Sequence, residues 1–212
     1  MIRVFELTGE VPPARDHYEQ LEAAYRAMAI SAATTFGARV IQQGKDAGYI
    51  LETKGFAETM TRLALAYIGQ EVIRRRITSV AETTRAQIVA AVARGYADGL
   101  GQQGVGSYVR SVVSDMATWR ANLIARTETH GAANFGAQEA AKETGLPLQK
   151  EWISAEDART RPDHDAANGQ IVGRDEPFRV GGEALMYPGD PRGSAENTIN
   201  CRCAIGWLVQ ED

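Results

Sequence analysis

Apolar residues recur at steps of three and four along the chain from Pro12 to Gly145, which is the spacing of one face of a helix. The first such stretch follows Pro12 and Pro13, and proline is tolerated in a first helical turn. Its apolar positions are Tyr18, Leu21, Tyr25, Met28, Ala32, Phe36 and Val40. The pattern predicts a long amphipathic helix that ends near Gly44 or Gly48.

A second helix is predicted from about Ala57 to Arg76. Its apolar face holds Met60, Leu63, Ala64, Tyr67, Ile68 and Val72. Ser79 and Glu82 then fit a capping box, in which each side chain accepts a hydrogen bond from an otherwise unpaired backbone N–H. A third helix is therefore expected to begin at Ser79.

The third helix is expected to end in a glycine-rich loop, GLGQQGVGS. We interpret this loop as a flexible hinge, because it lacks the lysine and the preceding strand of a phosphate-binding loop. A short helix around Val109 to Met116 should follow it, and then a long helix from Trp119 to Thr144 that Gly145 stops. Small residues dominate the second half of that long helix, so it is suited to close packing against another element.

Beyond Pro147 the pattern changes to short apolar runs: LQKEWI, QIV, PFRV, ALMYP and CAIGWLV. Turn-forming pairs, Asn168-Gly169 and Gly181-Gly182, separate them. The pattern indicates a compact β-rich module from about residue 148 to 210. Helices first and strands afterwards favour an α+β fold, in which the small module packs on the last long helix.

Composition narrows the function classes. The chain has 212 residues, 44% hydrophobic and 24% charged, as is typical of a folded globular protein. The net charge of −4 provides no general attraction to nucleic acid, so any DNA contact should be local and weak. The chain contains no run of eighteen apolar residues, so no membrane-spanning helix is predicted. Its first residues lack the basic-then-apolar order of a secretory signal. A cytoplasmic protein is expected, with no membrane partner.

Both cysteines lie in one Cys201-Arg202-Cys203 triplet, where a disulfide across one residue would be strained. Together with His164 they can supply three of the four ligands of a zinc ion, which prefers sulfur and nitrogen donors. The fourth ligand would have to be Asp157, Asp163, His130 or a water. The alternative is that the cysteines are small buried apolar residues and that His164 is a hydrogen-bonding turn residue.

An enzyme could be built from the same residues, either a thiol enzyme in which a cysteine pairs with His164 or a metal-dependent hydrolase. Asn168 or Asp163 would orient the histidine in the first case, and Asp157 or Asp163 would act as base in the second. The sequence context expected of a nucleophile and a helical His-Glu-x-x-His pair are both missing. A structural role, without catalytic residues, is therefore the favoured hypothesis.

Charged residues gather around these candidates. A candidate anion site or salt-bridge cluster is formed by Arg159, Arg161, Asp190 and Arg202. Acids are as frequent as arginines in this region, which favours the salt-bridge network over an anion site. A second basic group is Arg74, Arg75 and Arg76. It is a candidate contact for DNA phosphates, although three positive charges closing the second helix would also suit its dipole.

Five ordered blocks stand out in the second half of the sequence: Arg120 to Gly136, Lys150-Glu-Trp152, Asp157 to His164, Asn168-Gly169, and Tyr187 to Cys203. Together, over about residues 118–208, they resemble the phage Mu F-like family of minor head, or head morphogenesis, proteins. The resemblance implies a minor capsid protein of a tailed bacteriophage, present in few copies inside the head. It implies portal and capsid proteins as partners, and a part in head assembly and DNA packaging or delivery. The protein would be in the host cytoplasm during assembly and in the virion afterwards. The expected division is a helical assembly region, 1–117, and the family domain, 118–212.

Overall fold

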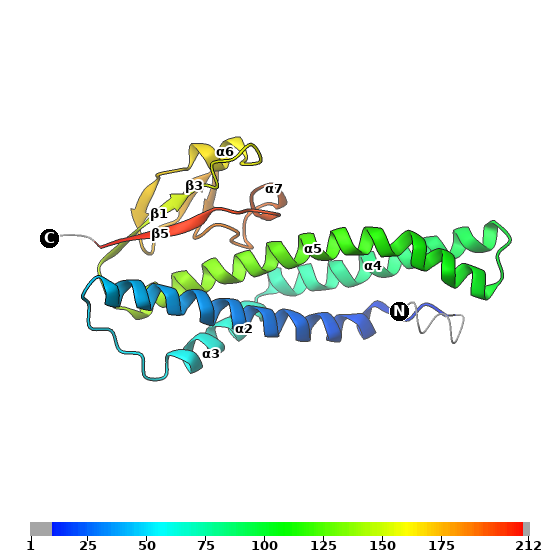
Figure 1. Cartoon of the computed structure of the whole chain (residues 1–212), viewed down its shortest axis with the longest axis horizontal. Helices are drawn as coiled ribbons and strands as arrows, with labels where there is room; N and C mark the ends of the chain where they lie inside the picture. Colours follow the sequence, from blue (N-terminus) through cyan, green and yellow to red (C-terminus); the bar gives the residue numbers. More distant parts are fainter. Residues whose placement is uncertain (1–9, 210–212) are drawn as a thin grey trace. The chain divides into compact units, whose positions relative to one another are not determined.

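The computed structural model describes residues 10–209, apart from the side chains at positions 16, 102 and 112–117. Within these described residues four helices come first: α2 (Ala14–Asp46), α3 (Phe56–Ile68), α4 (Glu71–Ala97) and α5 (Gln102–Glu143). The remaining elements are β1 (Leu148–Ile153), α6 (Pro162–Ala166), β2 (Ile171–Gly173), β3 (Phe178–Val180), β4 (Glu183–Leu185), α7 (Ala195–Thr198) and β5 (Ala204–Val209) (Figure 1). The expected α+β class is confirmed.

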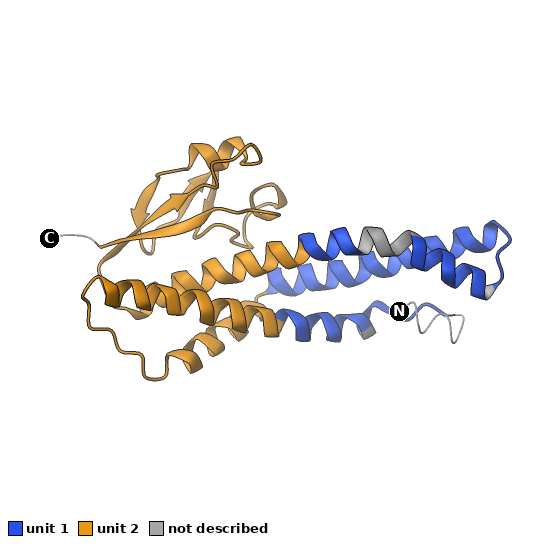
Figure 2. Cartoon of the chain, viewed as in Figure 1, with its two compact units in different colours: residues 1–25, 71–123 blue, residues 26–70, 124–212 orange. Residues whose placement is uncertain are grey.

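The chain forms two compact units (Figure 2). Unit 1 consists of residues 1–25 and 71–123, and unit 2 consists of residues 26–70 and 124–212. The chain therefore passes from one unit to the other three times, within α2, before α4 and within α5. All the candidate metal ligands belong to unit 2.

The boundary between the second and third helices differs from the one predicted. The break expected between Arg76 and Ser79 is wrong, because α3 ends at Ile68 and α4 begins at Glu71. Ile73 and Ile77 are fully buried, so the apolar stripe of α4 runs through the predicted break. Ser79 and Glu82 lie inside α4 as exposed residues, where a capping box has no backbone groups to satisfy.

The predicted glycine loop is also shorter than expected. Gly99 has the positive φ of 79° that only glycine adopts readily, and α5 begins at Gln102, so Gly104 and Gly106 lie within the helix. Helix α5 then continues without the predicted interruption before Trp119. The α4 and α5 segments are held by a buried cluster of Ile88, Ala91, Val105 and Val109.

In unit 2, α2 and α5 approach each other closely at two small residues. A Cβ atom added to Gly136 would lie 2.4 Å from the Cα atom of Ala33. Nearby, the rings of Tyr67 and Phe135 stack with centroids 4.7 Å apart. The small-residue half of α5 is thus the packing surface that the sequence predicted.

The β-rich module contains two antiparallel sheets. The larger has the order β2-β1-β5, with Trp152 of β1 opposite Ile205 of β5. The smaller is the β3–β4 hairpin, whose two-residue turn is Gly181-Gly182, with φ of 55° and 80°. Positive φ at both central residues is the requirement of the tight hairpin turn that the glycine pair predicted. The core of the module consists of Trp152, Ala167, Phe178, Val180, Leu185, Cys201 and Cys203.

The module also contacts α5, as expected. A Cβ added to Gly131 of α5 would lie 2.9 Å from the carbonyl oxygen of Gly189 in the module. Within residues 10–209, no helix combines the length and the apolar composition that crossing a bilayer requires.

Candidate metal centre

His164 lies on α6, a single short turn that begins with Pro162. Arg161, the residue before it, has extended backbone angles, and proline's fixed φ suits the first helical position. The turn places the His164 side chain in the interior, with 2% of its surface exposed. There its ring meets Trp152 edge to face, with centroids 5.5 Å apart.

The two cysteines are presented by the segment between α7 and β5. Asn200 has a φ of 58°, in the left-handed region that asparagine tolerates, and the chain turns there before β5. Helix α5 holds this turn from outside: the Asn200 N–H donates to Thr127 Oγ1 at 3.0 Å, and Arg126 donates to Asn200 Oδ1 at 3.0 Å. Cys201 and Cys203 then both face inward, while Arg202 between them reaches Asp157.

The three predicted ligands come together. His164 Nδ1 lies 3.3 Å from Cys203 Sγ and 3.7 Å from Cys201 Sγ, and all three ligand atoms lie within 4.8 Å of one another. Tetrahedral zinc with the usual bond lengths sets its sulfur and nitrogen ligands about 3.5–3.8 Å apart. The buried group has the donor types and the spacing that a metal ion requires.

The pKa values of the two thiols are shifted in opposite directions. The hydrogen bond from Cys201 is the largest influence on Cys203 and, together with the hydrogen bond and charge of His164, lowers the pKa of its thiol. The same interaction, with burial, raises the pKa of the Cys201 thiol. The thiolate form is therefore favoured at Cys203 over Cys201, and the thiolate is the form that binds metals.

The two carboxylates proposed as fourth ligands are engaged elsewhere. The guanidinium of Arg202 binds both carboxylate oxygens of Asp157 and, with the Arg159 N–H, holds the pKa of that carboxyl well below its usual range. The Asp163 carboxylate lies against the hairpin turn, since a Cβ added to Gly181 would be 2.8 Å from its Oδ2. His130, by contrast, lies beside the group: its ring contacts Asn134 Nδ2 at 3.1 Å and also interacts with the backbone and the thiol of Cys203.

A small cavity adjoins His164 and Cys203 and is lined by polar groups from Thr160, Asn200 and Arg202. Its volume of about 10 Å³ is close to the minimum that holds one water molecule. The structure therefore provides room for a water in the fourth position.

The predicted cluster of Arg159, Arg161, Asp190 and Arg202 is divided between two places. Arg159, Arg161 and Arg202 surround this cavity, and Arg161 donates to the carbonyl of Ile199. Asp190 is not with them: it is fully buried and accepts from the Met186 N–H at 2.9 Å and from Arg192. The Arg202–Asp157 ion pair and the Arg161 hydrogen bond join the segment before α6 to the segment between α7 and β5.

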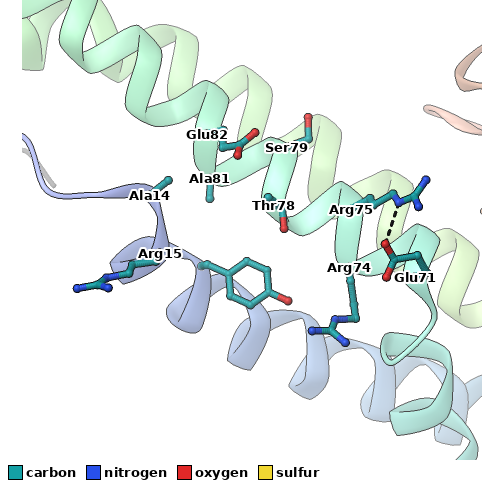
Figure 3. A pocket seen from close by; sticks show the side chains of 10 residues that line it. Ala14, Arg15, Glu71, Arg74, Arg75, Thr78, Ser79, Ala81 and Glu82 are labelled. Atoms are coloured by element: carbon teal, nitrogen blue, oxygen red, sulfur yellow. Dashed lines mark hydrogen bonds and ion pairs between the residues drawn. The ribbon is translucent and has the colours of Figure 1, made fainter.

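Arg74, Arg75 and Arg76 lie in unit 1, close to the first turn of α4. The expectation that they close a helix and suit its dipole is therefore wrong. Arg75 pairs with Glu71 at 2.9 Å, and Arg74 and Arg75 line an open cavity of about 720 Å³ that also includes Arg15 and Glu82 (Figure 3). Their contact with DNA stays a prediction.

Lys150 was missed by the sequence analysis. Its side chain is fully buried, and Nζ donates to the Met186 carbonyl at 2.7 Å and to Gln138 Oε1 at 3.3 Å. Nζ also lies 5.1 Å from the ring centroid of Phe178. Burial lowers the pKa of this ammonium to about 8. The period-two alternation of LQKEWI, which puts Lys150 on the same face as Trp152, was the signal that could have found it.

Comparison with known proteins adds the family to this geometry. The family model described as "Phage Mu protein F like protein" matches residues 72–206, more than half of the chain. The chain belongs to the phage Mu protein F-like family. The matched segment of this family member begins in α4, well before the residue 118 expected from the sequence, and it includes His164, Cys201 and Cys203.

Three curated relatives match parts of this family member. Minor head protein GP7 of Bacillus phage SPP1 is 34% identical over 127 residues, which are 58% of this chain and 40% of that protein. The NAD(+)–arginine ADP-ribosyltransferase EFV of Enterococcus faecalis is 36% identical over 83 residues, 38% of this chain and 17% of that protein. The uncharacterized protein YqbB of Bacillus subtilis is 29% identical over 94 residues, 42% of this chain and 31% of that protein. The chain thus spans less than half the length of each relative, and no solved structure matches it.

Proposed function

We propose that this chain is a structural minor capsid protein of a tailed bacteriophage, located inside the head near the portal vertex and acting in head morphogenesis and DNA packaging or delivery. The observation that carries the proposal is the family match over residues 72–206, together with the 34% identity to a relative named minor head protein. The portal and capsid proteins are its proposed partners, with packaged DNA as a weak one.

The metal centre has a structural part in this proposal. His164 would be held to Cys201 and Cys203 by one structural zinc ion, with a water as the fourth ligand. A module of this size buries little apolar surface, and small modules often gain stability from a metal ion. The ion would link α6 to the start of β5, two segments that the sheets do not join directly.

The geometry does not favour an enzyme at this centre. A metal-dependent hydrolase needs a coordination position open to substrate and a carboxylate base. The cavity beside His164 and Cys203 has a volume of about 10 Å³, which leaves no room for a substrate. Asp157, the candidate base, is bound through both carboxylate oxygens by Arg202. The match to the ADP-ribosyltransferase covers 17% of that protein and is no basis for proposing a transferase activity here.

The test is to locate the full-length chain in assembled heads. Purified heads should contain it at low copy number by quantitative mass spectrometry, and heads assembled without it should be fewer or defective. An asymmetric cryo-EM reconstruction should place its density at the portal vertex. Absence of the chain from heads, or its presence throughout the shell at high copy number, would contradict the proposal.

A further inference from the structure

Strand β5 is an edge strand with unusual composition. Within residues 10–209 it pairs with β1 alone, so its other edge carries backbone N–H and C=O groups without a strand partner. Its sequence, AIGWLV, contains no charged residue and no proline. Folded proteins usually protect such edges with charges, prolines or a covering element, because an uncharged edge strand pairs readily with another chain.

A groove lies between this strand and two helices of the same unit. The groove is lined by Ala204, Ile205 and Trp207 of β5 and by residues of α2 and α5. The groove has a volume of about 640 Å³, within the range of roughly 300–1,000 Å³ that is typical of ligand sites. A peptide strand that pairs with β5 in this groove would lie about 4.8 Å from it, the usual spacing of neighbouring strands.

The charge of the groove indicates what would occupy it. Its lining includes Arg39, Arg126 and Arg202 and no acidic residue, although the chain as a whole has a net charge of −4. Arg202 is paired with Asp157, so Arg39 and Arg126 provide most of the positive potential. Arg39 lies 4.6 Å above the ring of Phe36, at the α2 wall.

From these observations we infer that the groove receives an extended acidic peptide segment of another protein, which pairs its backbone with the free edge of β5. Its acidic side chains lie against Arg39 and Arg126, and its alternate apolar side chains face the groove wall near Phe36 and Ile205. Pairing of this kind obtains affinity from main-chain hydrogen bonds and specificity from alternate side chains. A second copy of the chain is a poorer occupant, because its own β5 carries no acidic residue.

The inference extends the proposed function by naming a surface for a partner, and it rests on that function only for the partner's identity. The probe is a fluorescently labelled eight-residue peptide that alternates valine and glutamate, titrated into the full-length protein and followed by anisotropy. Two control peptides replace glutamate with lysine or carry N-methyl groups on alternate amides. The acidic peptide should bind, and both control peptides should bind at least about tenfold more weakly, since one reverses the charge and the other lacks donors for the strand edge.

Two protein variants locate the binding. Arg39→Glu should weaken binding of the acidic peptide about five- to tenfold, because it reverses an exposed charge at the groove. Arg62→Glu makes the same charge change on exposed α3, outside the groove, and should leave binding within about twofold, as expected for a screened distant charge. Equal binding of the three peptides, no binding of the acidic one, or dimerisation through β5 detected by analytical ultracentrifugation would overturn the inference. These results do not depend on whether the chain is found in phage heads.

Discussion

The Nδ1 atom of His164 lies 3.3 Å from the Sγ atom of Cys203, although 39 positions separate the two residues along the chain. This contact links the short α6 turn to the entrance of β5. Cys201 completes the group from the other side of Arg202. We therefore expect each of these three side chains to contribute strongly to the stability of the module.

The first prediction concerns metal content. The full-length protein purified without chelator should contain one zinc ion, and His164→Gln, Cys201→Ser and Cys203→Ser should each lose it. Loss of the ion should lower the free energy of unfolding by about 4 kcal/mol or more, as losses of structural metals do. Inductively coupled plasma mass spectrometry and chemical denaturation measure the two effects. His17→Gln, which removes a histidine of unit 1, is the matched control. A metal-free wild type whose melting temperature is unchanged by chelator would remove zinc from the proposal.

The second prediction concerns the close approach of α2 and α5. Gly136→Ala should destabilise the protein by about 1–3 kcal/mol, the usual cost of overpacking, because its methyl group would meet the Ala33 backbone at 2.4 Å. Gly104→Ala in the same helix is the control: its methyl would meet Leu100 at 3.4 Å, an ordinary contact. That variant should be neutral or more stable by up to about 1 kcal/mol, since alanine favours a helix. Similar melting temperatures for the two variants would show that the α2–α5 contact is looser than described.

The third prediction tests Asp190. Asp190→Ala should cost about 2–3 kcal/mol, because it removes a fully buried carboxylate that accepts from the part-buried Met186 N–H and pairs with Arg192. Asp175→Ala removes an exposed acid from its pair with Arg174 and should cost less than about 1 kcal/mol. Urea denaturation followed by circular dichroism compares them. A cost for Asp190→Ala no larger than for Asp175→Ala would mean that its hydrogen bonds do not hold the loop.

The fourth prediction concerns pH and Lys150. Burial lowers its folded-state pKa to about 8 from the ordinary 10.5, so between these values the unfolded chain binds more protons than the folded one. Stability must then rise with pH across this window, and the cost of burying the charge is fully present below pH 8. Relative to Lys150→Met, the wild type should gain on the order of 1 kcal/mol between pH 7.5 and 9.5. Parallel pH profiles of the two proteins would place the Lys150 pKa near its ordinary value.

The fifth prediction concerns DNA. The full-length chain should bind duplex DNA weakly, with a Kd on the order of 10⁻⁴–10⁻⁶ M at physiological salt, and the affinity should fall steeply as salt rises. The double variant Arg74→Glu, Arg75→Glu should weaken binding further, whereas Arg39→Glu with Arg62→Glu, the same charge change in unit 2, should do so less. Titrations at two salt concentrations measure both effects. Tight binding that is insensitive to salt would show that the net charge of −4 is a poor guide to this surface.

The strands were well predicted from the sequence, because strand and turn conformations here depend on a few neighbouring residues, such as the short apolar runs and the Gly181-Gly182 pair. It also selected His164, Cys201 and Cys203, since these side chains are unusual in combination. Residue type alone did not exclude Asp157 as a ligand, because its pairing with Arg202 joins positions 45 apart and depends on the folded chain.

The helix boundaries were harder to predict for a physical reason. Ser79 and Glu82 suit an N-terminus, yet they are also acceptable on the exposed face of a helix interior. Glycine disfavours a helix by about 1 kcal/mol, but packing offsets that cost where an element approaches closely. Gly95 is such a position, since a Cβ there would lie 3.2 Å from Val105. Only tertiary contacts decide between these outcomes.

The alternation of the chain between its two units has a consequence during synthesis. Residues 26–70 leave the ribosome before their partners in 124–212, with residues 71–123 of the other unit made in between. At about 5–20 residues per second, that interval lasts roughly 3–10 s. For that time the α2 surface around Ala33 has no α5 to pack against. Unit 2 therefore cannot finish folding before its C-terminal part is made, and slower translation of residues 71–123 would lengthen the exposure of the apolar face of α2 to chaperones and proteases.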